Sequence, residues 1–434
     1  MNPQLLAISG GTPVRQRHWP RFDKGDVDVN EREIEAARRV LGKKLLFRYD
    51  TRGMAETEVG CFEKALQDYF GVKHALAVSS GTAALTVSLM AIGIKAGDEV
   101  LCSAFAFAAD PSSIILAGAT PVLVEVDREM HIDIADLEKR ITPKTRAILV
   151  VHQRGQAGPM EPLLELARKY KLPVVEDAVP ALGARIGSQY LGTFGTFGAF
   201  STQADKSLNT GEGGFLLTND TLLFERAVLL SGAYETRVHK HCTWPLSIRE
   251  QSLPLFNFRM DELRGALGQV QLEKLPARLR TLSNNYARIE RFLCAYPEVR
   301  IRKSHVPEAT LGHYIVFQLE GSTPEDAHWT AEALTAEGVD ARCFGVLGRP
   351  NIRSFWNWEF LFPGQSQQQI RARLPATAGL LDLTIDIALS PMLSGQDLDD
   401  LEHALAKVLT HRAGKQAAPE TAVRAAAGGE GLPA

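Results

Sequence analysis

The sequence has few of the features that mark membrane, secreted or nucleic-acid-binding proteins. No apolar run is long enough to span a bilayer. No long run of lysine and arginine occurs and the formal net charge is −3, so we expect neither a nucleic acid nor a membrane surface as a partner. The N-terminus lacks a basic start followed by a long apolar stretch, so we expect no signal peptide.

Cysteines and short catalytic motifs are also scarce. The five cysteines are odd in number, scattered and without a CxxC pair, which predicts reduced thiols and a cytoplasmic protein. His239 and His241 lie close together, but no second ligand pair with zinc spacing accompanies them, so we expect no metal site. A GxSxG elbow is absent, which argues against a Ser–His–Asp hydrolase. The glycines of residues 192–198 do not form GxGxxG between a strand and a helix, which disfavours a nicotinamide site.

The residues that are present favour a large α/β domain. Between about residues 55 and 232, short β-branched runs alternate with longer amphipathic ones. This alternation predicts a mostly parallel sheet with helices on both faces, and ligands at the carboxyl ends of its strands. The predicted strands are His74–Val78, Glu99–Cys102, Pro121–Val126, Ala147–Val151, Pro173–Glu176, Gly198–Ser201 and Phe215–Thr218. The predicted helices are Glu56–Tyr69, Thr82–Ile92, Ile134–Arg140 and Glu161–Tyr170.

The pattern changes after Pro297 and indicates a smaller α+β domain. The predicted elements around and beyond this point are helices Met260–Leu282 and Asn284–Tyr296, strands Val299–Arg302 and His313–Leu319, and helices Pro324–Glu337 and Gln396–Leu409. Residues after Arg412 are rich in Ala, Gly and Pro without periodicity, which predicts disorder. We therefore divide the chain into an N-terminal arm (1–30), a large domain (31–283), a small C-terminal domain (284–411) and a disordered tail (412–434).

The segment Ser79-Ser80-Gly81-Thr82 follows one predicted strand and opens a helix. The free N–H groups and positive dipole end of a helix N-terminus make a natural phosphate site. A serine or threonine before a helix is also an ordinary N-cap, so the segment alone does not decide between the two interpretations.

An acid and a lysine follow in the order that a pyridoxal phosphate (PLP) site requires. Asp177 ends an apolar strand, where it either faces a cation such as a pyridinium nitrogen or caps the next turn. Lys206 precedes the glycine-rich run Gly211–Gly214 and is a surface lysine, an ion-pair partner or the amine that forms an imine with an aldehyde. PLP needs such a lysine and an acid that faces its ring nitrogen.

Two further residues suit the same ligand. Phe107 lies just after a strand, where its ring either stacks on a cofactor or packs in the core. Ser201 ends another strand, and its hydroxyl either donates to a phosphate or bonds to the backbone.

The order of the motifs resembles the DegT/StrS family of PLP-dependent aminotransferases, which make amino sugars, aminocyclitols and antibiotics. The matching motifs are Ser-Gly-Thr-Ala-Ala-Leu, Glu-Asp-Ala, Phe-Ser-x-Gln-x-x-Lys, Gly-Glu-Gly-Gly and Asn257-Phe-Arg259-Met-Asp-Glu262-Leu. The resemblance covers nearly the whole chain except the tail. It implies an aspartate-aminotransferase-like α/β fold (fold type I) and a homodimer with shared active sites.

The resemblance also assigns residues. It implies that Lys206 forms the Schiff base and moves protons, that Asp177 holds the ring nitrogen and that Phe107 stacks on the ring. It implies that Asn257 reaches the phosphate of the partner subunit. The remaining phosphate ligands would be Ser80, Gly81, Thr82 and Ser201.

Several positions depart from the family pattern. Pro180 stands where members usually have Gln or His near the 3-hydroxyl of the cofactor, and Thr202 is unusual. Gln203 is typical of the members that act on cyclitols and aminohydroxybenzoate precursors. Arg154 lies in a segment that replaces a pocket-lining loop, so it is either a carboxylate or phosphate ligand or a surface arginine. We expect the substrate to contact Arg154, Gln203 and His313.

The resemblance implies amino transfer from glutamate or glutamine to a keto sugar, a ketocyclitol or a related keto intermediate. Another PLP reaction on the same fold, such as elimination or dehydration, is the first alternative. Family members that dehydrate sugars have His in place of the lysine, so Lys206 favours transamination. A regulatory protein that binds PLP without turnover is an alternative of a different class.

Overall fold

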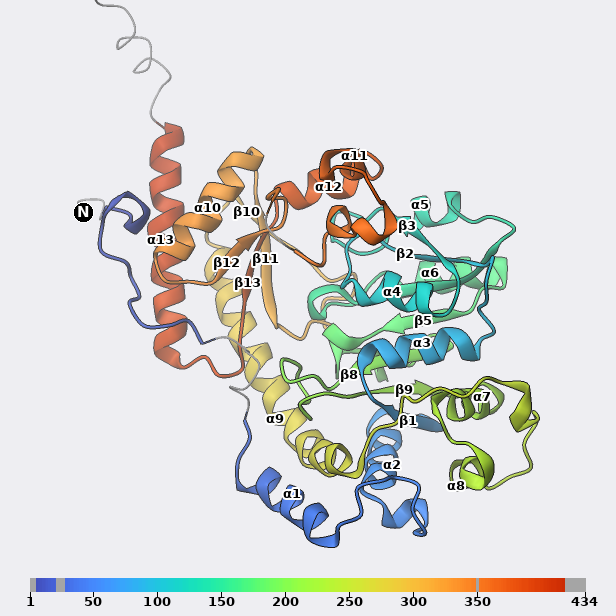
Figure 1. The fold of residues 1–434 in the computed structure, drawn as a ribbon. Helices are drawn as coiled ribbons and strands as arrows, with labels where there is room; N and C mark the ends of the chain where they lie inside the picture. The colour runs from blue at the N-terminus through green and yellow to red at the C-terminus, as the bar shows by residue number, and fades with distance from the viewer. Residues whose placement is uncertain (1–4, 21–27, 349–350, 418–434) are drawn as a thin grey trace, which may run out of the picture.

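The computed structural model describes residues 5–20, 28–348 and 351–417. Within these residues the strands form a seven-stranded sheet, a four-stranded sheet and a two-stranded ribbon. Figure 1 shows helices packed around the large sheet, with the four-stranded sheet beside it. The strands are β1 (His74–Val78), β2 (Glu99–Ser103), β3 (Thr120–Val124), β4 (Thr145–Val151), β5 (Val174–Asp177), β6 (Arg185–Ile186), β7 (Gln189–Tyr190), β8 (Phe197–Ser201), β9 (Gly214–Thr218), β10 (Val299–Ile301), β11 (Tyr314–Leu319), β12 (Ala341–Cys343) and β13 (Ile385–Ala388).

The large sheet has the strand order β1-β9-β8-β5-β4-β2-β3. Neighbours from β3 to β8 run parallel, whereas β9 runs antiparallel to both β8 and β1. The prediction of a mostly parallel sheet is confirmed, and all seven predicted strands end within two residues of the observed bounds. The carboxyl ends of β1, β2, β4, β5 and β8 therefore meet at one edge of the sheet.

These strands are mostly apolar on both faces, because both faces of the sheet are covered by helices. In β4, Leu149 and Val151 belong to the core under α3, α4 and α7, whereas Ile148 and Val150 belong to the core under α5 and α6. The α-helices are α1 (Glu31–Lys43), α2 (Glu58–Phe70), α3 (Gly81–Ala91), α4 (Ala109–Leu116), α5 (Ile134–Lys139), α6 (Met160–Tyr170), α7 (Thr221–Ser231), α8 (Val238–His241), α9 (Glu262–Leu293), α10 (Pro324–Ala336), α11 (Gln367–Arg371), α12 (Pro375–Asp382) and α13 (Gly395–Ala417).

Short 3-10 turns complete the described secondary structure. They are η1 (Ala7–Ser9), η2 (Met54–Glu56), η3 (Gln153–Gly155), η4 (Val179–Ala181), η5 (Glu235–Arg237), η6 (Glu250–Ser252), η7 (Phe355–Asn357) and η8 (Glu359–Leu361). None of the helices in the described ranges is both long and apolar enough to cross a membrane.

Helix α9 joins the two sheets. The sequence predicts two helices here, but the structure has one helix of 32 residues that continues through Pro276. It is continuous because its two halves are buried in different cores: Leu275 packs with α2 and the large sheet, and Ile289 packs with the second sheet. Figure 1 shows it extending from α1 and α2 to β10–β13. The boundary that we placed between residues 283 and 284 therefore falls inside a helix.

The second sheet has the antiparallel order β10-β11-β13-β12 and is covered by α10 and α13. Residues 5–20 pack against it, because Arg15 bonds to Asp397 in α13 at 2.7 Å and Glu337 accepts the Ala7 N–H at 2.8 Å. Helix α13 continues past its predicted end at Leu409 to Ala417, and the rest of the predicted tail lies outside the described residues.

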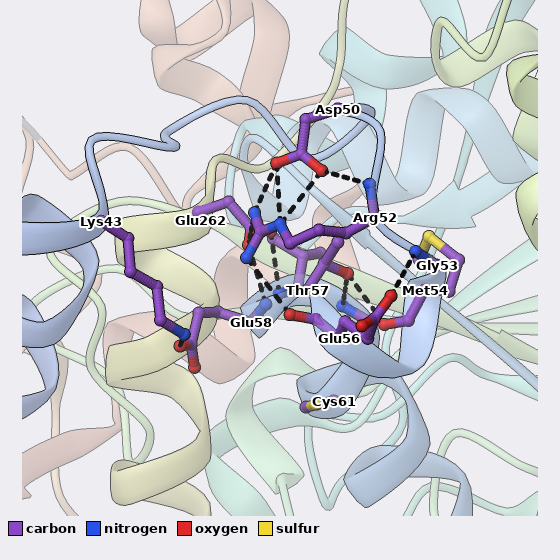
Figure 2. Close-up of polar contacts among 12 residues, drawn as sticks. Lys43, Asp50, Arg52, Gly53, Met54, Glu56, Thr57, Glu58, Cys61 and Glu262 are labelled. Carbon is purple, nitrogen blue, oxygen red and sulfur yellow. Dashed lines mark hydrogen bonds and ion pairs between the residues drawn. The ribbon is translucent and has the colours of Figure 1, made fainter.

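A polar cluster fixes the start of α9 against the start of α2. The buried Glu262 carboxylate accepts the backbone N–H groups of Glu58 at 2.8 Å and Val59 at 3.2 Å. Figure 2 shows Arg52 between Glu262 and Asp50, and the Arg52–Glu262 distance is 3.0 Å. The cluster satisfies amide groups at the N-terminus of α2 and so holds the segment before α9 beside β1.

Candidate active site

A cavity of about 360 Å³ opens at the carboxyl edge of the large sheet. It collects residues from the loops after β1, β2, β4, β5 and β8 together with residues of the second sheet. This is where a parallel α/β sheet places its ligands. The predicted site residues that line it are Ser80, Gly81, Thr82, Phe107, Arg154, Asp177, Ser201, Gln203, Lys206 and His313.

The N-terminus of α3 forms one end of the cavity. The Ser80 hydroxyl accepts the Ala83 N–H at 3.0 Å, so it caps the helix as the N-cap interpretation predicts. Among the described residues, no partner receives the N–H groups of Gly81 and Thr82, and both residues line the cavity. The two amides and the helix dipole can therefore bind an anion there.

Close packing requires glycine in the anion cradle, as we call the Gly81 and Thr82 amides at the N-terminus of α3. A Cβ at Gly81 would lie 2.8 Å from the Ser201 Cβ, and one at Gly214 would lie 2.5 Å from the Ser80 carbonyl carbon. The backbone of α3 consequently approaches β8 and β9 more closely than any side chain would allow. The space in front of these amides is left open for a ligand.

The two acids at the end of β5 have different roles. Glu176 is fully buried and accepts N–H groups from Gly192, Phe194 and Gly195 at 2.6–2.8 Å, so it holds the turn before β8. Asp177 instead lines the cavity, and its Oδ1 accepts the Val179 N–H at 3.0 Å. Asp177 is therefore the acid that a bound cation can reach.

Asp110 is a site residue that the sequence analysis missed. It lies in α4 with no exposed surface, and neither of its carboxyl oxygens receives a hydrogen bond from the described residues. Its carboxyl faces that of Asp177, and the two acids interact electrostatically. Burial raises the pKa of Asp110 well above its ordinary value, and burial raises that of Asp177 as well. Asp110 therefore holds a proton that it can donate to the Asp177 carboxylate.

Lys206 lies in the loop between β8 and β9. Backbone hydrogen bonds fix this loop, from Lys206 N–H to the Gln203 carbonyl at 2.9 Å and from Ala204 N–H to the Gly211 carbonyl at 3.0 Å. The side chain is 25% exposed, lines the cavity and places Nζ 3.3 Å from Asp205 Oδ1. The amine is thus partly desolvated and reachable from the cavity, as imine formation requires.

The aromatic wall of the cavity is Phe107. Its side chain is 44% exposed, so it is not the core phenylalanine of the alternative interpretation. Arg353, which the sequence analysis also missed, lies over this ring with its Cζ 5.7 Å from the ring centroid. A flat ligand can stack on a ring placed in this way.

Two of the predicted substrate contacts, Arg154 and His313, already bond to other side chains of the protein. Arg154 has a left-handed backbone with φ 55°, and its guanidinium bonds to Asp386 at 2.9 Å. His313 bonds to the Ser207 hydroxyl at 2.7 Å, and burial, together with the charges of Lys206 and Arg278, lowers its pKa to about 4.

Four other residues that the sequence singled out lie in different places. Gln203 and Pro180 line the cavity. Thr202 is buried and bonds to Thr210 at 2.6 Å, and it is absent from the described cavity lining. Asn257 is exposed on the loop before α9 and likewise lies outside that lining.

The family model described as the DegT/DnrJ/EryC1/StrS aminotransferase family matches residues 28–406. The chain belongs to this family. The family resemblance of its motifs is therefore confirmed, and the protein is a PLP-dependent aminotransferase. The site fits that cofactor, because it combines an open amide cradle, a buried acid and a reachable amine.

Two relatives show the range of the family. GDP-perosamine synthase of Caulobacter vibrioides is 37% identical over 292 residues, which cover 67% of this chain and 74% of that protein. L-glutamine:2-deoxy-scyllo-inosose aminotransferase of Micromonospora echinospora is 36% identical over 227 residues, which cover 51% of this chain and 52% of that protein. The chain thus spans about half the length of the second relative.

Solved structures confirm the predicted fold type I. GDP-4-keto-6-deoxy-D-mannose-3-dehydratase of E. coli, with bound hydrated PLP, has a TM-score of 0.73 at 20% identity. The match covers 90% of this chain and 100% of that chain. At this identity the likeness concerns the fold.

Proposed function

We propose that this aminotransferase moves an amino group from glutamate or glutamine to a keto sugar, a ketocyclitol or a related keto intermediate in amino-sugar or secondary-metabolite biosynthesis. The observation that carries the proposal is that Lys206, Asp177 and the N-terminus of α3 all face one cavity. The names of the two relatives, a perosamine synthase and a glutamine:inosose aminotransferase, support this range of acceptors.

The cradle at α3 would hold the phosphate of the cofactor. The N–H groups of Gly81 and Thr82 point their dipoles at the anion, and the Ser201 hydroxyl lies next to Gly81 to donate a further bond. Ser80 caps the helix and lines the same cavity, so it keeps the amides in place.

Asp177 would hold the ring nitrogen and Phe107 would stack on the ring. A pyridinium charge opposite Asp177 compensates the cost of burying its carboxylate. Burial raises the pKa of Asp110 well above its ordinary value, so Asp177 would be the member of the pair that ionises. The negative charge of Asp177 would then keep the ring nitrogen protonated, and Asp110 would lie on the other side of the Asp177 carboxylate.

Lys206 would do the proton transfer. When bound, PLP supplies an aldehyde for the lysine amine and a ring that takes up electron density from the substrate carbon. Once the amino donor has displaced it, Lys206 Nζ accepts the proton from the donor Cα and delivers it within the same cavity. Asp205 Oδ1, 3.3 Å from Nζ, is an anionic partner of the amine in the same cavity.

Substitution of the lysine tests the proposal. Lys206→Ala should lose the absorbance of the lysine-bound cofactor and the transfer of nitrogen from glutamate or glutamine to keto-sugar nucleotides and ketocyclitols. Lys169→Ala is the control, because Lys169 is 62% exposed and pairs with Glu138 at the surface. Full turnover by Lys206→Ala would show that this residue is not the reactive amine.

Elimination or dehydration on the same fold is the second candidate, since Pro180 lines the cavity and offers no side-chain donor to the cofactor. The reaction of the bound cofactor with the amino donor alone separates transamination from elimination or dehydration. Glutamate or glutamine should convert the bound cofactor to its amine form in a transaminase. A protein that binds PLP and a keto-sugar nucleotide but never produces that amine form would support dehydration instead.

We further propose that the protein is a homodimer with shared active sites and that it lies in the cytoplasm. We also propose that the two sheets form a large and a small domain, which α9 joins. Asn257 is exposed and lies outside the described cavity lining, which is the placement expected of a residue that serves the partner subunit. All five cysteines are free thiols, as in proteins of a reducing compartment. Sedimentation of the purified protein tests the dimer.

A further inference from the structure

Two arginines line the cavity, and among the described residues only one of them has an anionic partner. Arg154 Nη2 bonds to Asp386 at 2.9 Å, and its Cζ lies 4.1 Å from the centre of the Tyr314 ring. Asp386 is buried in the second sheet, where this contact neutralises it. Arg154 is therefore held in place with its charge already balanced.

Arg353 has no such partner. Its guanidinium makes no hydrogen bond and no ion pair with any residue in the described ranges, although it lies over Phe107 and lines the cavity. Burial and the nearby charge of Arg154 lower the pKa of Arg353. Arg353 is partly exposed and its guanidinium carries five donors that have no partner among the described residues, so an anion that enters the cavity can bind it.

The backbone fixes Arg353 against the edge of the site. Its carbonyl accepts the Ala106 N–H at 3.2 Å, and the next residue, Ser354, forms a β-bridge with Phe105. Ser354 and Phe105 are both fully buried. The backbone of Arg353 is consequently held beside the loop that carries Phe107, and its guanidinium lies over the Phe107 ring.

We propose that Arg353 binds the α-carboxylate of the amino donor. A guanidinium fork matches a planar carboxylate with two parallel hydrogen bonds. An amino-acid donor carries this group on the carbon that reacts, and Lys206 lines the same cavity as Arg353. The diphosphate of a sugar nucleotide carries more charge than one free guanidinium balances, since Arg154 is committed to Asp386. The proposal rests on the proposed transaminase function.

The experiment compares glutamate with 4-aminobutyrate, which is glutamate without its α-carboxylate. In the PLP-loaded protein, Arg353→Gln should raise the concentration of glutamate needed to convert the cofactor by about 10- to 100-fold. The response to 4-aminobutyrate should stay unchanged. Arg353→Lys should give an intermediate value, because lysine keeps the charge and loses the fork. Arg373→Gln is the control, because Arg373 bonds to Gln365 at the surface.

The outcomes separate this proposal from the proposed function. Equal effects of Arg353→Gln on both donors, or no effect, would overturn the carboxylate contact while transamination stands. An effect confined to the keto acceptor would assign the anion to the acceptor and also overturn it. A second readout needs no turnover: calorimetry should show glutarate binding to the wild-type protein and weaker binding to Arg353→Gln. Glutarate binding through Arg353 in a protein that reacts with no donor would refute only the proposed function.

Discussion

At the scale of single residues, the site depends on which acid keeps its proton. Asp110 is the only charged residue between Val100 and Val124, and the fold buries it behind Asp177. Two carboxyl groups this close cannot both ionise at low cost. The pair therefore shares one negative charge, and that charge faces the cavity through Asp177.

Asp110→Asn tests this sharing through stability. A carboxyl whose pKa is raised in the folded state binds its proton more tightly there than in the unfolded chain, so its contribution to stability is lost as the pH rises. Asparagine keeps a donor for Asp177 and does not titrate. The advantage of Asp110→Asn in urea unfolding of the cofactor-free protein should therefore grow above about pH 4, by up to ~1.4 kcal/mol per pH unit.

If the difference in free energy of unfolding between Asp110→Asn and the wild-type protein stayed constant from pH 4 to pH 8, Asp110 would ionise normally in the folded protein. Glu138→Gln is a suitable control, since Glu138 is a surface carboxyl paired with Lys169.

Lys206 and Asp177 could be predicted from the sequence because each follows a strand and lies in a recognisable motif. Arg353 and Asp110 could not. Arg353 follows no strand, and only the long-range pairing of Ser354 with Phe105 brings it to the cavity. Asp110 is noticeable in the sequence as a lone charge, but its proximity to Asp177 arises from the packing of α4.

At the scale of elements, the strands of the large sheet were predictable because burial on both faces makes them mostly apolar runs, whereas β12 and β13 of the second sheet were not predicted. Helix α4 was not predicted, since it is short and has Pro111 in its first turn. The single helix α9 was not predicted either, because the run of polar residues near Asn284 suggests a break there. Its continuity depends on burial in two cores, which no local pattern reveals.

The cradle at α3 gives a prediction at this scale. Gly81→Ala places a methyl group 2.8 Å from the Ser201 Cβ, so α3 or β8 must shift and the amides lose their alignment. We expect the affinity for PLP to fall about 10-fold or more, which corresponds to the loss of roughly one charge-assisted hydrogen bond. Titration of the cofactor-free protein with PLP measures this affinity.

Gly379→Ala is the matched control. Gly379 lies inside α12, and a Cβ there meets no atom within 4 Å. This substitution should leave the PLP affinity unchanged and stabilise the protein by about 0.5–1 kcal/mol. Equal PLP affinity of both variants would contradict the packing argument.

At the scale of the whole molecule, residues 5–20 are fastened to the second sheet by one buried arginine. Arg15 is 2% exposed and contacts Asp397 at 2.7 Å and Asp400 at 2.8 Å. Arg15→Ala should lower the free energy of unfolding by about 1.5–3 kcal/mol, because Asp397 and Asp400 lose their buried charged donor and keep only the exposed Arg17 as a cationic partner. It should also expose residues 5–20 to proteases.

Arg17 provides the comparison within the same cluster. It contacts Asp397 at 3.2 Å but is 56% exposed, so Arg17→Ala should lower the stability by less than about 1 kcal/mol. Similar losses in the two variants would show that burial does not decide the strength of these pairs.

The contact between residues 5–20 and α13 has a consequence for biosynthesis. Residues 5–20 are translated well before Asp397, so they have no partner while most of the chain is made. At about 5–20 residues per second this delay is roughly 20–80 s. During that time Leu6 and Trp19, both buried in the finished protein, are exposed to the cell. The core of the second sheet can close only after translation has passed α13, so Leu6 and Trp19 cannot be buried there before then.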